Sequence, residues 1–267
     1  VAQAVAGRGI PRAHFTGGHR MSAVAALTLR TLSGTLRDAD LLFAVLAPVG
    51  CFLGFTLALG NLIDTGQMTY PQYVLPVVIV QAMLFGAMTT ADRAARDRLS
   101  GFGVRLRTLP IPAVVPLAAR MLYCLIRAVI ALVAGTAVAS MFGFRMAGGL
   151  GYAVLFVVIV LAFAIAVCLG ADALGSRIGT VESSSQLLLL PQLVLVLLST
   201  GMAPAESFPA WLGPFVRYQP VSQVTETLRG LASGHVSGAG LAVTVAWCIT
   251  LMALFGGLAL GMQRRTR

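Results

Sequence analysis

Arginine supplies all the basic charge in this sequence: the chain has nineteen basic residues, and none of them is lysine. Five lie close together in the segment 92–110, between two long apolar stretches, and they are Arg93, Arg96, Arg98, Arg105 and Arg107. Such a block of charge cannot lie in hydrocarbon, where a single arginine costs about 2.5–3.5 kcal/mol. We therefore expect this segment to lie in water next to a membrane.

The remaining residue types argue against catalysis by this chain alone. A phosphate-binding loop of the GxxxxGK[ST] type needs a lysine for the nucleotide phosphates, so we expect neither ATP hydrolysis nor a bound cofactor here. An intramembrane serine protease needs a GxSG-like serine with a histidine nearby. No GxSG occurs, and His14, His19 and His235 all lie outside the apolar stretches.

The four cysteines stand singly inside apolar stretches, without CxxC or Cys/His spacing. They are Cys51, Cys124, Cys168 and Cys248. Isolated cysteines of this kind pack as small hydrophobic residues. We expect neither a metal site nor a disulfide.

Two further arginines, Arg120 and Arg127, lie inside an apolar stretch. Their spacing of seven residues places them on one face of a helix. Arg120 is near enough to the end of the stretch for its side chain to reach the membrane surface. Arg127 lies deeper, so it pairs with protein groups or meets a polar group of a substrate; the sequence leaves both alternatives open.

Composition places the chain among integral membrane proteins. Its residues are 58% hydrophobic and 10% charged, whereas about a quarter of the residues of a soluble domain are charged. The net charge of +10 does not indicate nucleic-acid binding, because the arginines fall near the ends of apolar stretches rather than among aromatic residues on a polar face. We predict a disordered cytoplasmic tail over 1–20 and one all-α membrane domain over 21–267.

Six apolar stretches are long enough to be membrane-spanning helices. A helix needs about 20 residues to cross about 30 Å of hydrocarbon, and only internally paired backbone is tolerated there. The six predicted spans are 41–59, 74–90, 114–142, 150–170, 181–200 and 239–262. Pro191 interrupts the fifth, so the fifth is the least regular.

The distribution of arginine predicts the topology. Fourteen arginines lie in the N-terminal segment, the connections after spans two and four, and the C-terminal segment, against Arg145, Arg217 and Arg229 on the other side. Cytoplasmic segments carry the excess of Lys and Arg, so we predict a multi-pass plasma-membrane protein with both termini in the cytoplasm. Asp172, with Arg177, is expected in a short cytoplasmic turn after span four.

Two segments outside the spans have patterns of their own. In 22–38, apolar residues share one helical face and arginines lie on another, which favours a helix in the membrane interface over a simple polar lead-in. The segment 199–231 combines four prolines with Phe208, Trp211, Phe215 and Tyr218. Its apolar character predicts short half-helices that enter the outer leaflet and return, followed by a helix over 221–231.

These features together resemble the permease subunits of type-2 ATP-binding-cassette (ABC) exporters, particularly the actinobacterial daunorubicin-resistance group. The resemblance rests on the interfacial helix, on RLSGFGVRLRTLPIPAVVPLAARML after span two, and on STGMAPAESFPAWLGPFVRYQPVSQVTETLRGL before span six. The last is the most specific, because the family has a proline-rich re-entrant hairpin followed by a QP or NP step and an RGL sequence. Here these are Gln219 with Pro220, and 228–231. The resemblance extends from about residue 22 over nearly the whole chain.

The resemblance implies that two permeases, often non-identical, assemble with two ATPase subunits that bind ATP and magnesium. It also implies that 92–107 is a coupling helix that docks on the ATPase. Apolar residues interleaved with the arginines favour this role over that of a solvated loop. The implied coupling residues are Arg93, Arg96, Asp97, Arg98, Leu99, Phe102 and Arg105. Asp97 and Ser100–Gly101 stand where many members have a glutamate and a Gly–Thr step.

We therefore predict an exporter permease that moves a hydrophobic or amphipathic molecule outward, such as an antibiotic or a cell-envelope lipid. Membrane lipid is then a partner, and nucleic acid is not. Candidate substrate-path residues are Arg127, Phe208, Trp211 and Phe215. The alternative is a carrier that does not use ATP, or a membrane assembly factor. A carrier needs titratable groups at mid-membrane, and the predicted spans place no Asp, Glu or His there.

Overall fold

The structure is a computed structural model that describes residues 40–60, 69–101, 114–178, 180–201 and 208–265. Within these ranges the chain forms α-helices and no strand. The helices are α2 (Asp40–Leu59), α3 (Tyr70–Leu99), α5 (Val114–Met141), α6 (Gly149–Gly175), α7 (Val181–Leu197), α8 (Gly213–Tyr218), α9 (Pro220–Ser233) and α10 (Gly238–Arg265). The predicted tail over 1–20 and the predicted interfacial helix over 22–38 lie outside the described residues.

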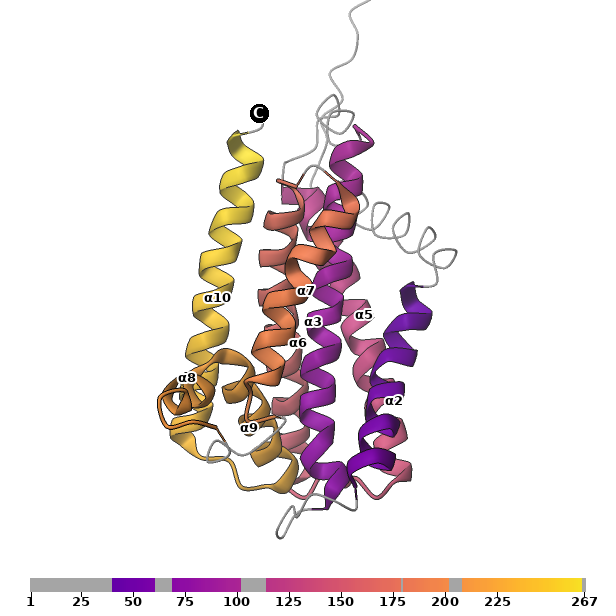
Figure 1. Cartoon of the computed structure of the whole chain (residues 1–267), viewed down its shortest axis with the longest axis vertical. Helices are drawn as coiled ribbons and strands as arrows, with labels where there is room; N and C mark the ends of the chain where they lie inside the picture. Colours follow the sequence, from indigo (N-terminus) through magenta and orange to yellow (C-terminus); the bar gives the residue numbers. More distant parts are fainter. Residues whose placement is uncertain (1–39, 61–68, 102–113, 179, 202–207, 266–267) are drawn as a thin grey trace, which may run out of the picture.

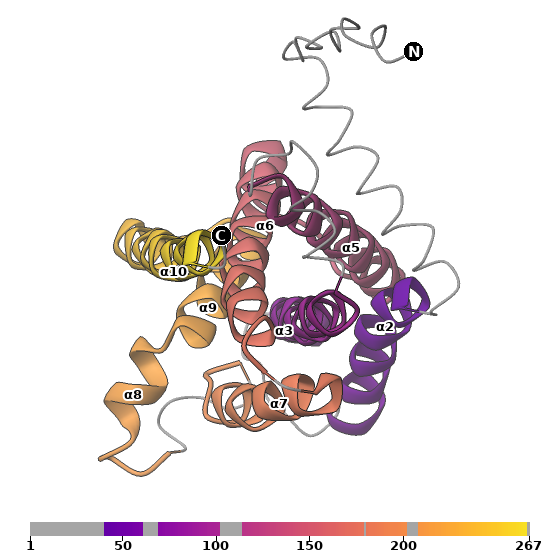
Figure 2. The ribbon, with the colours of Figure 1, turned by 90° about the horizontal axis from the view of Figure 1, so that it is seen from above.

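Helix α3 is the centre of the bundle, with α2, α5, α6 and α7 around it (Figure 2). Its apolar side chains are buried along most of its length, from Leu75 and Ile79 to Ala91 and Ala95. Helix α10 lies at the outside against α6 and α9, and most of its apolar side chains are exposed. An apolar helix with so little burial in a single chain is suited to contact with lipid or with another subunit.

Five described helices, α2, α3, α5, α6 and α10, are long and apolar enough to cross a membrane. They correspond to predicted spans one, two, three, four and six. The fifth predicted span corresponds to α7, which passes through Pro191 as helix but has 17 residues. That length gives about 25 Å, which is shorter than about 30 Å of hydrocarbon. The described helices thus confirm an all-helical membrane protein with five candidate spans.

The predicted separate helix after span two is wrong for the residues described. Helix α3 continues without interruption through Asp92 to Leu99, so the first half of the proposed coupling segment is the end of α3 itself. The helix ends at Leu99 with Ser100 as its C-cap, and Gly101 follows with φ of +67°, a backbone conformation that glycine adopts readily. Phe102 and Arg105 lie outside the described residues.

The helix ends fall into two groups (Figure 1). One end of the bundle holds the end of α3, the start of α5, the end of α6 and the end of α10; we name it the Arg-rich end, after Arg93, Arg96 and Arg98. The opposite end, which we name the α9 end, holds the start of α3, the end of α7, and α8 and α9. The predicted helix over 221–231 is confirmed as α9.

Helices α3 and α6 approach each other closely at Gly175, near the Arg-rich end. A Cβ atom at Gly175 would collide with the backbone carbonyl of Ala91, so only glycine permits this distance. We expect Gly175→Ala to separate the two helices and to destabilise the chain by about 1–3 kcal/mol, measured as the thermal midpoint of the detergent-solubilised protein. Gly151→Ala in the same helix is the control, because nothing lies within 4 Å of its Cβ position. Equal midpoints for the two variants would contradict this packing.

Candidate functional site: the charged end of helix α3

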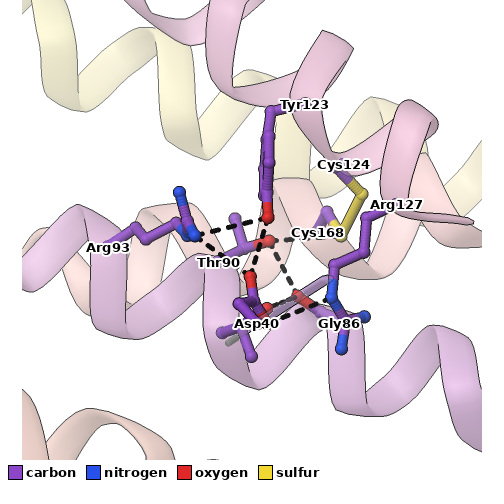
Figure 3. Close-up of polar contacts among 9 residues, drawn as sticks. Asp40, Gly86, Thr90, Arg93, Tyr123, Cys124, Arg127 and Cys168 are labelled. Carbon is purple, nitrogen blue, oxygen red and sulfur yellow. Dashed lines mark hydrogen bonds and ion pairs between the residues drawn. A yellow bond between two sulfur atoms is a disulfide. The ribbon is translucent and has the colours of Figure 1, made fainter. Parts of the chain in front are cut away.

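Asp40, the first residue of α2, is the centre of a buried polar cluster (Figure 3). Its Oδ2 accepts hydrogen bonds from Arg93 Nη2 at 3.0 Å and from the Tyr123 hydroxyl at 2.8 Å. Its Oδ1 accepts from Arg127 Nε at 3.3 Å. We name Asp40, Arg93, Tyr123 and Arg127 the Asp40 cluster. It joins α2, α3 and α5 through one carboxylate.

Tyr123 orders the cluster, because its hydroxyl both donates to Asp40 and accepts from Arg93 Nη2 at 3.3 Å. The Arg93 guanidinium also lies over the Tyr123 ring, 4.2 Å from the ring centroid, where the π electrons attract the cation. Asp40 and Arg127 are buried. One carboxylate thus faces two guanidinium groups, so the cluster by itself carries one excess positive charge.

A second cluster lies beside the first, nearer the Arg-rich end. Arg120 donates from Nε to Asp172 Oδ1 at 2.5 Å and from Nη2 to Asp172 Oδ2 at 3.1 Å, a bidentate pair. Its Nη1 lies 3.5 Å from Asp97 Oδ2. We name Asp97, Arg120 and Asp172 the Arg120 cluster. It carries one excess negative charge, so the two clusters together balance three arginines with three aspartates.

Regular helical spacing brings these side chains together. On α3, Gly86, Thr90, Arg93 and Asp97 follow each other at intervals of three or four residues, which places them on one face. On α5, Arg120, Tyr123 and Arg127 do the same. Gly86 makes room for the arginine from α5, because a Cβ atom there would lie 2.7 Å from Arg127 Nη1.

Asp172 corrects a sequence-based prediction. It was expected in a cytoplasmic turn, but it lies within α6 and its residue surface is 2% exposed. The predicted fourth span ends at residue 170, whereas α6 continues to Gly175 and carries this carboxylate three residues before its end. Burial of a carboxylate is tolerated when it is paired and hydrogen-bonded, and Arg120 supplies both of its bonds.

The prediction that the cysteines form no disulfide is wrong for one pair. Cys124 of α5 and Cys168 of α6 form a disulfide, and the Thr90 hydroxyl lies 3.5 Å from the Cys168 sulfur (Figure 3). Cys124 follows Arg120 by one helical turn, and Cys168 precedes Asp172 by one turn. The bridge therefore lies directly behind the Arg120–Asp172 pair, between the same two helices. Spacing within the sequence could not show this pair, because the partners come from different spans.

The predicted coupling residues separate into two groups. Arg93 belongs to the Asp40 cluster, and Asp97, whose side chain is 40% exposed, belongs to the Arg120 cluster, so both bond to side chains of neighbouring helices. Arg96 and Leu99 are exposed at the end of α3. Arg98 is exposed too, and it donates from Nη1 to the Ser176 carbonyl at 2.9 Å, which binds the end of α3 to the end of α6. The exposed tip of α3, which contains Arg96 and Leu99, therefore lies next to a network of ion pairs.

The predicted substrate-path residues do not come together. Arg127 lies in the Asp40 cluster, whereas Phe208, Trp211 and Phe215 lie in or just before α8 at the α9 end (Figure 1). Trp211 is 79% exposed. For Arg127, the first alternative left open by the sequence, pairing with protein, agrees with its bond to Asp40. A substrate contact for these four residues stays a prediction.

Sequence reasoning missed Asp40, Tyr123 and the partner of Arg120. The available signal was charge balance: two arginines inside one apolar stretch require carboxylates, and few acidic residues lie near the spans. The correct partners, Asp40 and Asp172, are 87 and 52 positions away. Only the packing of α2, α5 and α6 around α3 selects them.

Comparison with known proteins identifies the family of the chain. A family model for the ABC-2 type transporter matches residues 22–233. The doxorubicin resistance ABC transporter permease protein DrrB of Mycobacterium tuberculosis is 31% identical over 239 residues, covering 84% of this chain and 83% of the relative. The probable doxorubicin resistance permease DrrC of the same organism is 29% identical over 215 residues, covering 78% and 75%.

A third relative comes from an antibiotic-resistance system of another bacterium. The daunorubicin resistance ABC transporter permease protein DrrB1 of Streptomyces coeruleorubidus is 28% identical over 228 residues, covering 84% of this chain and 80% of the relative. The family model covers most of the chain, including α3 and both charge clusters. These matches, with the all-helical bundle and its five candidate spans, establish that the chain belongs to the ABC-2 type transporter family as a membrane permease.

Proposed function

We propose that this permease is driven by ATP hydrolysis on a separate ABC ATPase subunit that docks on the tip of α3. The observation that carries the proposal is the exposed tip, Arg96 and Leu99, standing on the buried clusters. Movement of the tip acts on Asp40 of α2 through Arg93 and on Arg120 of α5 through Asp97, and it reaches Asp172 of α6 through Arg120. The charge clusters therefore provide a rigid connection from a docking surface to three other helices.

The proposed topology has both termini in the cytoplasm of a plasma-membrane protein. The Arg-rich end is then cytoplasmic, in agreement with the excess of arginine there, and α7 with the residues to 200 forms the fifth of six spans. A re-entrant course for α8 is supported by Trp247 of α10, whose ring N–H donates to the Tyr218 carbonyl at 3.0 Å. Trp247 is the tenth residue of α10, about 14 Å from the start of that helix. The end of α8 therefore lies beside the part of α10 that is proposed to lie within the membrane.

The proposed complex contains two ATPase subunits, which hold ATP and magnesium, and a second permease. A non-identical second permease is supported by the relatives, since both DrrB and DrrC of Mycobacterium tuberculosis match this chain. A single domain over 21–267, the interfacial helix over 22–38 and the docking roles of Phe102 and Arg105 belong to the same proposal.

The proposed substrate is a hydrophobic or amphipathic molecule that moves outward. The relatives' names refer to resistance to doxorubicin and daunorubicin, which supports an antibiotic of that chemical class; a cell-envelope lipid is the second possibility. The buried carboxylates do not favour a proton-coupled carrier, because the Asp172 and Asp40 oxygens are engaged by arginine and tyrosine.

Replacing the exposed side chains at the tip of α3 by acidic ones tests the proposal. We expect the double substitution Arg96→Glu with Leu99→Asp to reduce recovery of the ATPase with the permease by about tenfold or more, as for other interface hot spots. Substrate transport in vesicles should fall in parallel, while the amount of permease in the membrane stays the same. Both side chains are exposed, so this variant does not disturb the clusters.

The matched control is Arg145→Glu with Met141→Asp, which makes the same charge changes at exposed positions of the opposite end. It should retain the ATPase. Full ATPase recovery and full transport in the Arg96→Glu, Leu99→Asp variant would refute docking on the tip of α3.

A further inference from the structure

The disulfide between Cys124 and Cys168, which we name the cysteine pair, joins two membrane helices inside the bundle (Figure 3). Cys124 is 4% exposed and Cys168 is fully buried. Alanine side chains of α3 and α6 pack around the pair, and Leu188 of α7 packs against the same group. Cys51 and Cys248 are free cysteines. The pair is therefore a covalent connection between α5 and α6 in the interior of the bundle.

The cysteine pair lies toward the Arg-rich end. Cys124 is the eleventh residue of α5, about 15 Å from the start of that helix, and Cys168 is seven residues, about 10 Å, before the end of α6. In the proposed topology this end is cytoplasmic. The cytoplasm keeps thiols reduced, and a disulfide that forms there is usually transient and either catalytic or redox-sensing. The position of the pair therefore favours a reversible bridge over a permanent structural one.

Both sulfur atoms have polar neighbours that suit the reduced pair. Cys124 Sγ lies 3.9 Å from the Ala164 carbonyl, an acceptor that the sulfur can use only when it carries a thiol proton. The Thr90 hydroxyl donates to the Gly86 carbonyl at 2.8 Å and lies 3.5 Å from Cys168 Sγ, so its proton can turn to the sulfur. The surroundings therefore accommodate two thiols as well as a disulfide.

The cysteine pair connects the same two helices as the ion pair between Arg120 and Asp172. Cys124 follows Arg120 by four residues, so both lie on one face of α5. Cys168 precedes Asp172 by four residues and shares its face of α6. With the disulfide closed, a covalent bond and a bidentate ion pair hold α5 against α6. With the disulfide open, only non-covalent contacts remain, and these can rearrange.

We propose that the cysteine pair is a reversible redox site, that low-molecular-weight thiols of the cytoplasm reduce it, and that its disulfide form arrests transport. The proposal rests on the proposed function, since the arrested movement is the one that the ATPase transmits from the tip of α3 through Asp97 and Arg120. In the disulfide form α5 and α6 cannot separate beside the Arg120 cluster. In the dithiol form the ATPase can drive that separation.

Reduction takes place by two thiol–disulfide exchanges. A thiolate of the reductant attacks the sulfur of Cys124, the less buried residue; the S–S bond breaks, and Cys168 leaves as a thiolate that the Thr90 hydroxyl stabilises. A second reductant thiolate attacks the mixed disulfide at Cys124 and releases the second cysteine thiolate. The two protons given up by the reductant pass to the two cysteines, and the reductant becomes a disulfide. With that disulfide as the oxidant, the reverse sequence closes the bridge.

Setting the redox state of the assembled complex tests the proposal. Cys51 and Cys248 are replaced by alanine, and the complex with its ATPase is reconstituted in proteoliposomes and treated with diamide or with dithiothreitol. Alkylation by N-ethylmaleimide in denaturant, read by mass spectrometry, counts the free thiols of the permease. ATP hydrolysis and ATP-driven transport of doxorubicin are measured on the same samples. The matched control carries Cys124→Ala and Cys168→Ala as well, so it cannot form the bridge.

We expect diamide to leave the permease without a free thiol and to reduce ATP hydrolysis and doxorubicin transport by about tenfold or more, a typical factor for coupling between two sites. Dithiothreitol should restore both free thiols and both activities. The alanine control should keep the same rates under both treatments.

Thr90 is a positioning residue in this proposal. We expect Thr90→Val to slow the appearance of free thiols under dithiothreitol by about threefold or more, because one hydrogen bond to the leaving sulfur is lost. Thr89→Val is the matched control, since the Thr89 hydroxyl donates to the Gly86 carbonyl at 3.0 Å and is not bonded to either sulfur. Equal reduction rates in the two variants would contradict the role of Thr90.

Three results would overturn the redox site: a closed bridge with full ATP hydrolysis and transport, two thiols that persist after diamide, or an equal loss of activity in the alanine control, which would assign the loss to thiols of the ATPase. Normal transport by the reduced complex alongside any of them would leave the proposed function standing. A reduced complex that hydrolyses ATP without moving doxorubicin would refute that substrate, while hydrolysis would still decide the redox site. A permease that recovers no ATPase would refute the proposed function, and the redox control with it.

Discussion

Replacing Asp40 by asparagine is expected to destabilise the chain by about 3–5 kcal/mol, because it leaves Arg93 and Arg127 buried without their carboxylate. Asp40 is the only described acidic residue that bonds to these two arginines. In a chain of this size, the thermal midpoint of the purified protein should fall by about 10 °C. The measurement is loss of the monodisperse peak in size-exclusion chromatography after heating.

A second substitution distinguishes the effect of the unpaired charge on stability from the effect of altered packing. Asp40→Asn combined with Arg127→Met removes one of the two orphaned cations and keeps its volume, so at least half of the lost midpoint should return. Tyr123→Phe removes only the hydroxyl and should cost about 1 kcal/mol. If Asp40→Asn alone matched the unmodified chain, the carboxylate would not be the centre of this cluster.

The second large effect is expected at Arg120, where Arg120→Leu leaves the buried Asp172 carboxylate with no counter-charge. The expected destabilisation is again about 3–5 kcal/mol, because α6 loses its ion pair with α5, although the Cys124–Cys168 bridge and the Arg98 bond to Ser176 remain. Transport should fall further than stability alone explains, because the Arg120 cluster lies between the docking tip and α6. The measurements are the thermal midpoint and transport per folded complex in vesicles.

Reversal of the pair provides the control for this prediction. Arg120→Asp with Asp172→Arg keeps opposite charges in contact but brings Asp97 next to an aspartate, so we expect partial recovery of the midpoint relative to either single variant. No recovery at all would indicate that the pair acts through shape rather than charge. Gln186, exposed on α7, can be replaced by leucine as a neutral substitution near the same end.

Much of the fold can be predicted from the sequence, because long apolar segments indicate membrane-spanning helices. The predicted 114–142 and 150–170 correspond to Val114–Met141 and Gly149–Gly175. The sequence predicts a separate helix for the charged residues at the end of α3, because five arginines within a short segment indicate the membrane boundary. The helix nevertheless continues to Leu99, because alanines at 91, 94 and 95 remain good helix formers packed against the bundle.

Only part of the functional site can be predicted from the sequence. Composition shows that Arg120 and Arg127 need partners, and helical spacing shows that they share a face. It does not show that Asp40, at the very start of α2, reaches Arg127, nor that α6 buries Asp172 one turn beyond Cys168. These pairings depend on how helices distant in the sequence pack around α3. For the same reason Arg93, which looked equivalent to Arg96, turned out to point inward while Arg96 points out.

That difference decides which substitutions distinguish docking from folding. A substitution at Arg93 disturbs the Asp40 cluster, so loss of transport there would report on stability. Arg96 and Leu99 are exposed, and changes there report on contact with a partner. Arg93 therefore tests the stability of the cluster, whereas Arg96 and Leu99, three and six residues further along the same helix, test docking.

Photocrosslinking from the tip of α3 tests the central claim most directly. A photoreactive amino acid is placed at Leu99, and in a separate variant at Met141, which is exposed at the α9 end of α5. After irradiation of the assembled complex in membranes, we predict a covalent adduct between permease and ATPase from position 99 and none from position 141. An ATPase that is present and active but gives no adduct from position 99 would contradict docking on the end of α3.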